Sequence, residues 1–204
     1  MENKLKLKEN RKLSTYTIIK RIIDIIISFL GIILLAPIFI LVSILIKLES
    51  DGPIIFKQLR AGKDSKAFYI YKFRSMKINA PNISTNEFED AKFFITKTGN
   101  FIRKTSIDEL PQLFNILKGD MSIVGPRPVI LEEQDLILLR QEYNVDSILP
   151  GITGWAQVNG RDTIGSDEKV KLDYEYLVNK SFKLDIYIIL LTIFKVLKKS
   201  DIKS

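Results

Sequence analysis

Two adjacent carboxylates, Asp108 and Glu109, stand where the sequence predicts the start of a helix. Carboxylates in a first helical turn complement the helix dipole, so a purely structural role accounts for the pair. An aspartate with an ordinary pKa of about 3.9 is also ionised at pH 7, and it needs no general base to act as a nucleophile. Spacing alone leaves both interpretations open.

Basic side chains accompany this pair and favour an anionic ligand. Lys72, Arg74, Arg103 and Arg127 have few acidic neighbours along the chain. Arginine is the side chain best suited to bidentate binding of phosphate. A carboxylate that attacks a diphosphate must overcome charge repulsion, and a divalent cation together with arginines supplies the shielding.

The composition removes several classes of chemistry. The chain has 204 residues with neither cysteine nor histidine, so it holds no disulfide, no thiolate or imidazole metal site and no Ser-His or Cys-His nucleophile pair. Catalysis would use carboxylates, lysine, arginine, hydroxyls and an oxygen-liganded cation. The net charge of +7 permits nucleic-acid binding. Because no helix-turn-helix or RNP-type aromatic signature is present, no nucleic acid is expected as a partner.

An apolar run of 22 residues without formal charge covers positions 25–46. As a helix it would extend about 33 Å, which is enough to cross a hydrocarbon core of about 30 Å. Pro37 lies in the middle of the run and is expected to kink it, which leaves two arms that each reach about halfway. Asp24 shares a helix face with Lys20 and Arg21 just before the run, where a structural role is expected.

The charges that flank this run bear on its topology. Residues 1–21 hold seven basic and two acidic side chains, and residues 47–66 hold five and three. A spanning helix usually has one basic, cytoplasmic flank, whereas here both flanks look cytoplasmic. A re-entrant hairpin in one leaflet is therefore favoured, and a proline-kinked spanning helix stays the alternative.

The remainder predicts an α+β fold that is mostly helical. Short strands are expected at 54–56 and 68–71, and helices at 128–143 and 167–179. Ser106 and Glu109 fit a capping box for a helix that ends at Gly119, although Pro111 disturbs the register and offers a second start. Residues 182–199 favour an interfacial amphipathic helix, with a buried globular helix as the alternative.

These patterns divide the chain into three predicted parts. They are a basic N-terminal segment with the re-entrant membrane helix (1–48), a cytoplasmic catalytic domain (49–181), and a C-terminal interfacial helix with its tail (182–204). A noncatalytic adaptor whose basic face binds anionic lipid stays open as an alternative to an enzyme.

Three blocks carry a resemblance to a known family. They are DGPIIFKQLRAGKDSKAFYIYKFRSM (51–76), RKTSIDELPQLFNILKGDMSIVGPRP (103–128) and PGITGWAQVNGR (150–161). In these blocks and their order, the chain resembles the bacterial sugar transferase family, the monotopic polyprenyl-phosphate phosphoglycosyl transferases, over about residues 18–199. The family's re-entrant helix is broken by a Ser-Pro pair, which Ala36-Pro37 matches without the serine. The resemblance is to the minimal form of the family.

The resemblance implies a reaction and its participants. The family transfers a sugar-1-phosphate from a UDP-sugar to undecaprenyl phosphate, releases UMP and needs Mg²⁺. This is the first membrane step in the synthesis of capsule, exopolysaccharide, O-antigen or glycoprotein glycans. It implies a location at the bacterial inner membrane with the active site facing the cytoplasm, in contact with lipid. A homo-oligomer stays open, and the blocks do not reveal the sugar.

The family's motifs also imply residue roles. Asp108 matches the nucleophile, which forms an acyl-phosphate sugar intermediate, and is the predicted metal ligand. Glu109 would assist at the metal or in proton handling. The matching substrate contacts to phosphate or uridine are Lys72, Arg74, Arg103, Arg127 and Arg161.

Overall fold

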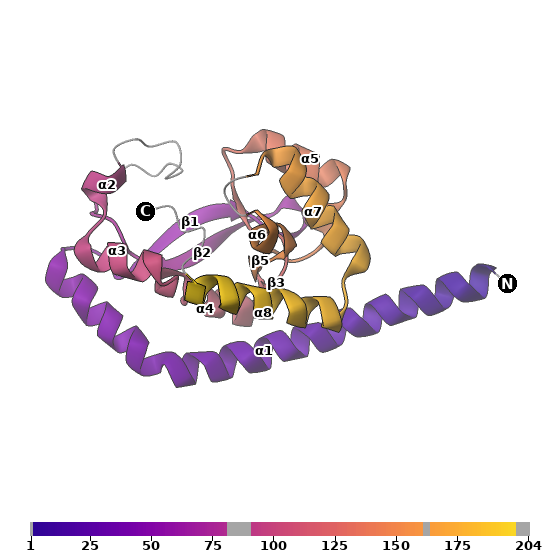
Figure 1. The fold of residues 1–204 in the computed structure, drawn as a ribbon, viewed down its shortest axis with the longest axis horizontal. Helices are drawn as coiled ribbons and strands as arrows, with labels where there is room; N and C mark the ends of the chain where they lie inside the picture. The colour runs from indigo at the N-terminus through magenta and orange to yellow at the C-terminus, as the bar shows by residue number, and fades with distance from the viewer. Residues whose placement is uncertain (1, 81–90, 161–163, 199–204) are drawn as a thin grey trace.

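The computed structural model describes residues 2–80, 91–160 and 164–198 (Figure 1). The helices are α1 (Glu2–Glu49), α2 (Ala91–Phe94), α3 (Lys97–Lys104), α4 (Gln112–Lys118), α5 (Gln134–Glu142), α6 (Trp155–Asn159), α7 (Ser166–Asn179) and α8 (Phe182–Lys198). The strands are β1 (Ile55–Ala61), β2 (Ala67–Phe73), β3 (Ser122–Val124), β4 (Val129–Ile130) and β5 (Gly151–Thr153). Short 3-10 turns are η1 (Lys63–Ser65), η2 (Ile107–Glu109) and η3 (Val145–Ser147).

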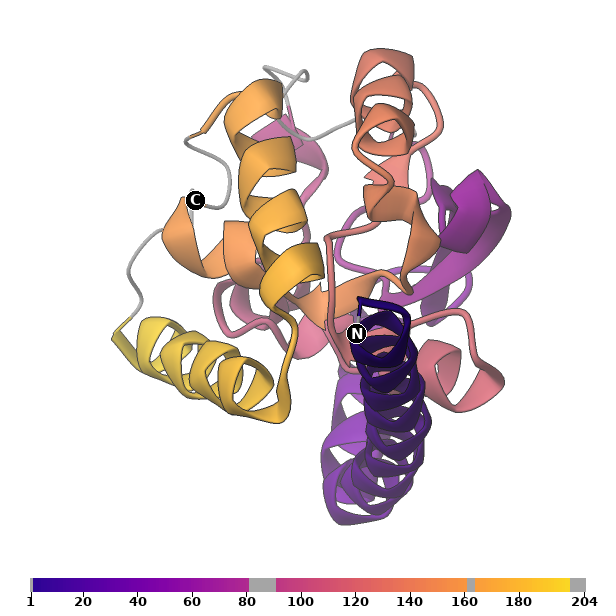
Figure 2. The same ribbon diagram turned by 90° about the vertical axis from the view of Figure 1, so that its right-hand side faces the viewer.

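Two small sheets lie within residues 50–181, here called the central part. The larger sheet has the order β2-β1-β4 with antiparallel pairing, and β3 pairs with β5 in parallel. Figures 1 and 2 show α1 below these sheets and α5 on the opposite side. The described residues thus confirm a mostly helical fold with some sheet.

One face of α1 packs on the central part along most of the helix. Asp24, Ser28, Val42 and Ile46 are each at most 3% exposed, and their spacing places them on one side. The opposite side carries large apolar side chains that remain exposed, among them Ile22, Phe29, Leu30, Ile33, Leu34, Ile40 and Leu41. By length and composition this helix could cross a membrane, and 11% of its most apolar stretch is buried. A continuous apolar face of this kind indicates a lipid contact.

Lys20, Arg21 and Asp24 lie on one face of α1, as predicted, and their side chains bind other elements of the structure. The Lys20 ammonium group forms an ion pair with Asp185 of α8 at 2.9 Å. The Tyr16 hydroxyl donates a hydrogen bond to the same carboxylate at 2.8 Å. These contacts hold the first half of α1 beside α8.

Arg21 and Asp24 attach α1 to the central part. The Arg21 guanidinium donates hydrogen bonds to the carbonyls of Ile116 and Leu117 at the end of α4, at 2.6 and 3.1 Å. The Asp24 carboxylate accepts a hydrogen bond from the Ser122 hydroxyl at 2.7 Å. Asp24 therefore has a structural role, as expected, because a buried carboxylate must be hydrogen-bonded.

The second half of α1 also contacts the central part. Val42 and Ile46 belong to one buried cluster with Phe73 of β2 and Ile102 of α3. The Glu49 carboxylate accepts hydrogen bonds from the first two backbone amides of α3, at 2.5 and 2.8 Å. Both halves of α1 thus pack on the same central part.

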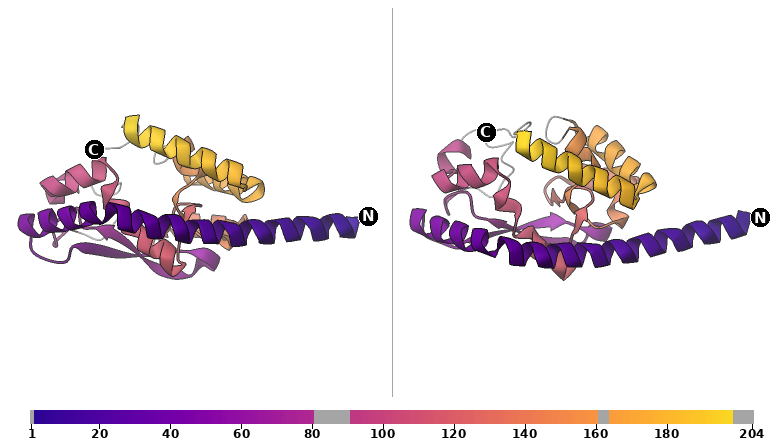
Figure 3. Two further views of the ribbon diagram at one scale, coloured as in Figure 1. Left: turned by 90° about the horizontal axis from the view of Figure 1, so that it is seen from below. Right: turned by 60° about the horizontal axis from the view of Figure 1, so that its bottom comes forward.

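Pro37 lies inside α1, and Figures 1 and 3 show that the helix is bent along its length. A proline lacks the N–H that the carbonyl four residues earlier would accept, which is an ordinary cause of a kink. The helix nevertheless continues through Ala36-Pro37 as one element. The break expected there is therefore a bend between two arms, and the re-entrant topology stays a prediction.

α8 is buried on one side and exposed on the other. Ile188 is fully buried and Asp185 is 7% exposed. The other side presents Ile186, Tyr187, Leu190, Ile193 and Phe194 to the exterior. Figure 3 shows α8 running beside α1. This arrangement suits a helix at the membrane surface, although its interfacial position stays a prediction.

The start of the helix before Gly119 differs from the capping-box prediction. Ser106 has a left-handed backbone, with φ of 56°, and makes no side-chain cap. Glu109 ends the 3-10 turn η2, and α4 begins after Pro111, which was the second predicted start. Gly119 ends α4 with φ of 101°, a conformation that glycine adopts without strain.

Other predicted elements are present with changed bounds. β1 and β2 extend the strands expected at 54–56 and 68–71, and α7 matches the helix expected at 167–179. The helix expected at 128–143 is shorter, because Val129 and Ile130 form β4 and α5 starts at Gln134.

The contact between Asp24 and Ser122 yields a prediction about stability. Asp24→Ala and Ser122→Ala should each lower the free energy of unfolding, by about 1–3 kcal/mol, because each breaks a hydrogen bond between buried groups. Asp24→Ala should cost more, because it also removes the acceptor of the Ile123 amide at 3.2 Å. The double variant should lose less than the sum of the two. Chemical denaturation of the detergent-solubilised protein followed by circular dichroism measures these values. Asp135→Ala, at an exposed carboxylate, serves as control and should change stability by about 0.5 kcal/mol or less. Additive losses would show that the two groups do not interact.

Candidate active site

The turn η2 places Asp108 and Glu109 between α3 and α4, against β2. The left-handed backbone of Ser106 ends α3 and starts this turn. Asp108 is 9% exposed, so its carboxyl group is largely withdrawn from water. The two carboxylates therefore occupy a tight turn that packs on the sheet instead of the first turn of a regular helix.

Glu109 joins two cations from other parts of the chain. Its Oε1 atom accepts hydrogen bonds from Lys72 Nζ at 2.8 Å and from Arg127 Nη2 at 3.1 Å. Lys72 belongs to β2, and Arg127 lies in the loop before β4. The side chain of Glu109 is 13% exposed, so its carboxylate is partly shielded from solvent in both ion pairs, whereas the Arg127 side chain is 39% exposed.

The electrostatic environment of Asp108 combines opposing effects. Burial raises the pKa of its carboxyl group above the ordinary value; Lys72 opposes the rise, and the negative charge of Glu109 adds to it. Arg103 and Arg127 also favour the ionised form. Asp108 is thus a buried carboxyl group near three cations, which suits a nucleophile that approaches an anionic substrate.

A buried ion pair holds the backbone of Arg127. The Arg140 guanidinium donates from Nη1 to the carbonyl of Arg127 at 2.7 Å and from Nη2 to Asp173 at 2.6 Å. Arg140 and Asp173 are 8% and 1% exposed. Because α5 supplies the arginine and α7 the aspartate, these two helices fix the loop that presents Arg127.

Close backbone packing restrains the same loop. The amide of Gly125 donates to the carbonyl of Thr153 at 2.9 Å, and the amide of Gly151 donates to that of Pro126 at the same distance. A Cβ atom on Gly151 would lie 2.2 Å from the nitrogen of Gly125, so glycine is required for this approach. The start of the loop that carries Arg127 is therefore held against β5 by both of its hydrogen bonds.

The structure brings five of the predicted site residues into one cluster. The cluster has a carboxyl group at its centre, a second carboxylate beside it and cations around them: Asp108, Glu109, Lys72, Arg103 and Arg127. Their roles in catalysis and substrate binding stay predictions.

Arg74, another predicted substrate contact, binds the backbone at the end of α1. Arg74 is 6% exposed and donates hydrogen bonds to the backbone carbonyls of Ser50, at 2.7 Å, and Asp51. This guanidinium stabilises the end of α1, and its predicted substrate contact stays a prediction. Arg161 lies outside the described residues.

Residue type and spacing gave no prediction for Arg60, Arg140 and Asp173. Arg60 lies in the first block that resembles the family, at residues 51–76, and this position was a reason to consider it. In the structure it lies near Arg127. Arg140 and Asp173 are 33 positions apart in regions that carry no motif, and only the packing of α5 on α7 brings them together.

The carboxylates suit the predicted metal by their type. Among the described residues no three acidic side chains gather into a metal site. Mg²⁺ is usually bound by one or two carboxylates together with waters and substrate phosphates, rather than by a full protein cage. Asp108, with Glu109 beside it, fits that kind of donor set.

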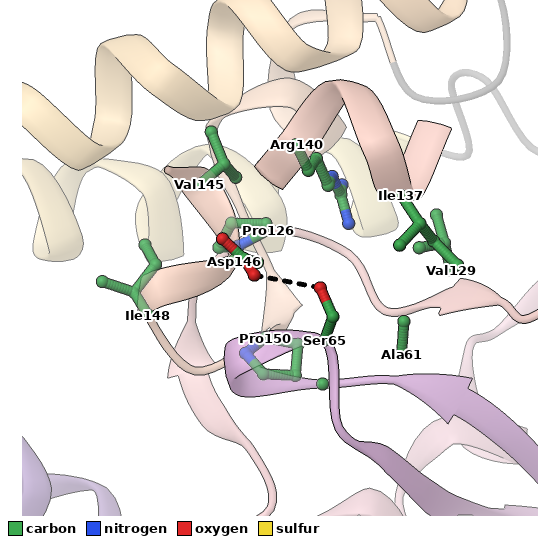
Figure 4. A pocket seen from close by; sticks show the side chains of 11 residues that line it. Ala61, Ser65, Pro126, Val129, Ile137, Arg140, Val145, Asp146, Ile148 and Pro150 are labelled. Carbon is green, nitrogen blue, oxygen red and sulfur yellow. Dashed lines mark hydrogen bonds between the residues drawn. The ribbon is translucent and has the colours of Figure 1, made fainter. Parts of the chain in front are cut away.

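A small cavity is lined by Pro126 and Val129, the residues on either side of Arg127 and Pro128 in the sequence (Figure 4). It has a volume of about 20 Å³ and is lined by Pro126, Arg140 and Pro150 and by the hydrogen-bonded pair Ser65 and Asp146. This is room for about one water molecule and is too small for a sugar nucleotide. The cavity therefore does not compete with the cluster around Asp108 as a substrate site.

Comparison with known proteins gives close relatives. A UDP-glucose:undecaprenyl-phosphate glucose-1-phosphate transferase of Escherichia coli is 43% identical over 185 residues, which cover 87% of this chain and 40% of that protein. The uncharacterised sugar transferase EpsL of Bacillus subtilis is 41% identical over 190 residues, 92% of this chain and 91% of EpsL. A UDP-N-acetylgalactosamine-undecaprenyl-phosphate N-acetylgalactosaminephosphotransferase of Aeromonas hydrophila is 42% identical over 184 residues, 87% of this chain and 43% of that protein.

The chain thus spans about two fifths of the length of the Escherichia coli and Aeromonas relatives. The sequence model of the bacterial sugar transferase family matches residues 15–199. That match includes the apolar part of α1, the cluster around Asp108 and all of α8. The chain therefore belongs to the bacterial sugar transferase family.

Proposed function

We propose that this protein is a phosphoglycosyl transferase that moves a sugar-1-phosphate from a UDP-sugar to undecaprenyl phosphate and releases UMP. The observation that carries the proposal is the buried Asp108 carboxyl group beside Lys72, Arg103 and Arg127. The names of the Escherichia coli and Aeromonas relatives describe transfer of this kind. The reaction would be the first membrane step in the synthesis of a capsule, exopolysaccharide, O-antigen or glycoprotein glycan.

The proposed first step uses Asp108 as the nucleophile. A carboxylate oxygen attacks the phosphorus that bears the sugar, and the bond from that phosphorus to the bridging oxygen of the diphosphate breaks. UMP leaves with the bridging oxygen, and an acyl-phosphate sugar remains on Asp108. Arg127 and Lys72 offset the negative charge that gathers on the phosphoryl oxygens, and Glu109 holds both cations in place.

The proposed second step regenerates the enzyme. A phosphate oxygen of undecaprenyl phosphate attacks the same phosphorus, and the bond from phosphorus to the Asp108 oxygen breaks. The product is a sugar joined to the lipid by a diphosphate. Because one carboxylate serves two substrates in turn, ping-pong kinetics are expected.

Mg²⁺ is the proposed cofactor, held by Asp108 with Glu109 beside it. When bound, it would shield the diphosphate charge and stabilise the leaving UMP. Lys72, Arg103 and Arg127 supply the positive charge that belongs to the chain itself.

The long apolar helix and the relatives that act on undecaprenyl phosphate indicate membrane association. We further propose that α1 re-enters a single leaflet on the cytoplasmic side. Its first half binds α4, β3 and α8, and its second half packs on Phe73 and Ile102. A helix that crossed the bilayer would place these two sets of contacts on opposite sides, whereas both sets join α1 to one central part, and this supports the re-entrant topology. A site held at the membrane surface would bring a soluble nucleotide and a lipid phosphate together.

The nucleophile assignment yields the first test of this function. Asp108→Asn should lower turnover by a factor on the order of 10³ or more, because a carboxamide does not replace the attacking carboxylate. The assay follows UMP release with undecaprenyl phosphate, Mg²⁺ and a panel of UDP-sugars. Wild-type protein incubated with the UDP-sugar alone should carry a sugar-phosphate adduct on Asp108, detected by mass spectrometry.

The matched control for this test is Asp135→Asn, which changes an exposed aspartate in the first turn of α5. It should retain normal turnover. Normal turnover by Asp108→Asn, or product formation with no adduct on Asp108, would exclude the proposed intermediate. If wild-type protein instead only binds anionic vesicles and releases UMP from no UDP-sugar, the noncatalytic membrane adaptor gains support.

The raised pKa of Asp108 yields a second test. The ionised nucleophile is lost as the pH falls through this pKa, so kcat/KM for the UDP-sugar should decline on the acid side, and the charges around Asp108 should set the position of this decline. Lys72→Met removes a positive charge and should move this decline to higher pH. Glu109→Gln removes a negative charge and should move it to lower pH. The same direction of shift in both variants would contradict the assignment.

The topology of α1 yields a third test. The natural chain has no cysteine, so single-cysteine variants label at one position. Thr15→Cys and Lys47→Cys should both react with a membrane-impermeant maleimide from the cytoplasmic face of sealed vesicles, and Lys57→Cys in the central part serves as the cytoplasmic reference. Labelling of the two positions from opposite faces would establish a spanning helix.

A further inference from the structure

Arg60 lies on the face of the main sheet that also carries Lys72. In the antiparallel register of β1 and β2, Phe56 is opposite Lys72 and Arg60 is opposite Phe68. Residues at every second position of a strand share a face, and directly opposed residues lie on the same face. Arg60 and Lys72 therefore extend from one surface of the sheet, about 14 Å apart along the strand at their backbones.

The pairing of β4 with β1 brings Arg60 next to Arg127. Ile130 of β4 is opposite Arg60, and Arg127 lies just before this strand. The Arg60 guanidinium reaches the carbonyl of Pro128 at 3.5 Å. Burial and the charge of Arg127 lower the pKa of Arg60 to about 10, while the more distant charges of Glu133, Glu109 and Glu132 oppose this without forming an ion pair. Arg60 thus stays protonated at neutral pH, and two guanidinium groups are neighbours at the edge of the Asp108 cluster.

The contacts of Arg60 use few of its donors. An arginine side chain has five N–H groups. The described hydrogen bonds of Arg60 are the contact with Pro128 and one with the side-chain oxygen of Gln58 at 2.5 Å. Its Nε atom is buried without a partner among the described residues. No carboxylate in the described part of the chain forms an ion pair with it, whereas Lys72 and Arg127 both pair with Glu109.

We propose that Arg60 is a further substrate-binding residue, which together with Arg127 binds a phosphate group at the edge of the active site. A half-buried guanidinium with unused donors beside a second one is costly without an anion, and a phosphate oxyanion satisfies both. The phosphate belongs either to the diphosphate of the nucleotide substrate or to the lipid carrier, and the two share this chemistry. The identity of the substrates rests on the proposed function, whereas the anion site rests on the geometry of Arg60.

The test compares two variants of the full chain in detergent, Arg60→Gln and Lys57→Gln. Both remove one positive charge from β1, but Lys57 lies on the opposite face over the ring of Tyr71. Calorimetric titration measures binding of UDP in one arm and of undecaprenyl phosphate in the other. Arg60→Gln should weaken binding in at least one arm by about tenfold or more, which corresponds to about 1.4 kcal/mol. Lys57→Gln should bind both ligands like the wild type.

A second measurement uses the wild-type protein and does not depend on the folding of a variant. Phenylglyoxal modifies arginine side chains, and mass spectrometry locates the modified residues. The ligand whose binding depends on Arg60, UDP or undecaprenyl phosphate, should protect Arg60 from modification. If Arg60→Gln weakens the binding of UDP, the site binds the nucleotide. If it weakens the binding of undecaprenyl phosphate, the site binds the lipid carrier.

The outcomes separate this proposal from the proposed reaction. The anion site would be overturned if Arg60→Gln bound both ligands like the wild type, or if neither ligand protected Arg60. In that case, release of UMP by the wild type would still support the proposed reaction. If wild-type protein releases no UMP from any UDP-sugar but ligand binding depends on Arg60, the anion site stands and the reaction does not. Absence of binding by the wild type in both arms would overturn the anion site.

Discussion

The interaction of Glu109 with Lys72 and Arg127 holds together segments that are far apart along the chain: the turn η2, strand β2 and the loop before β4. All three charges lie near the buried Asp108. The removal of one partner from such a shielded group would leave the others uncompensated, which costs more than the loss of a surface pair. Glu109 balances the charge of Lys72 and Arg127 when no substrate is bound. In the described part of the chain, these cations can therefore stay beside Asp108 without an ion pair to Asp108 itself.

The helix α1 is bound to the same elements that position the cluster around Asp108. Arg21 binds the end of α4, whose first turn follows η2, and Asp24 binds Ser122 on the strand that leads to the Arg127 loop. The polar face of α1 therefore reaches the elements that position Asp108 and Arg127. On the other side of the same helix, the apolar face points outward. If α1 lies in lipid as proposed, its depth there would set the height of Asp108 and Arg127 above the hydrocarbon.

The site residues that stand in recognisable motifs could be predicted from the sequence, whereas residues that meet only through helix packing could not. Asp108, Glu109, Lys72 and Arg127 were identified from residue type and motif, and they meet in space. The capping box at Ser106 was wrong because its backbone is left-handed, a state that residue type does not reveal in serine. Arg140 and Asp173 were missed because two helices without motifs must pack before they meet. The shared face of Lys20, Arg21 and Asp24 followed from helical periodicity, but their partners on α4, α8 and β3 did not.

The contact between α1 and the rest of the molecule has a consequence for folding. Asp185, Ser122 and the last carbonyls of α4 find partners on α1, which comes before all of them in the sequence. If that helix were cut away, these groups and the apolar surfaces of Phe73 and Ile102 would lose their cover. The central part therefore reaches its final packing only with α1 in place, so this helix is a part of the fold as well as the proposed membrane anchor.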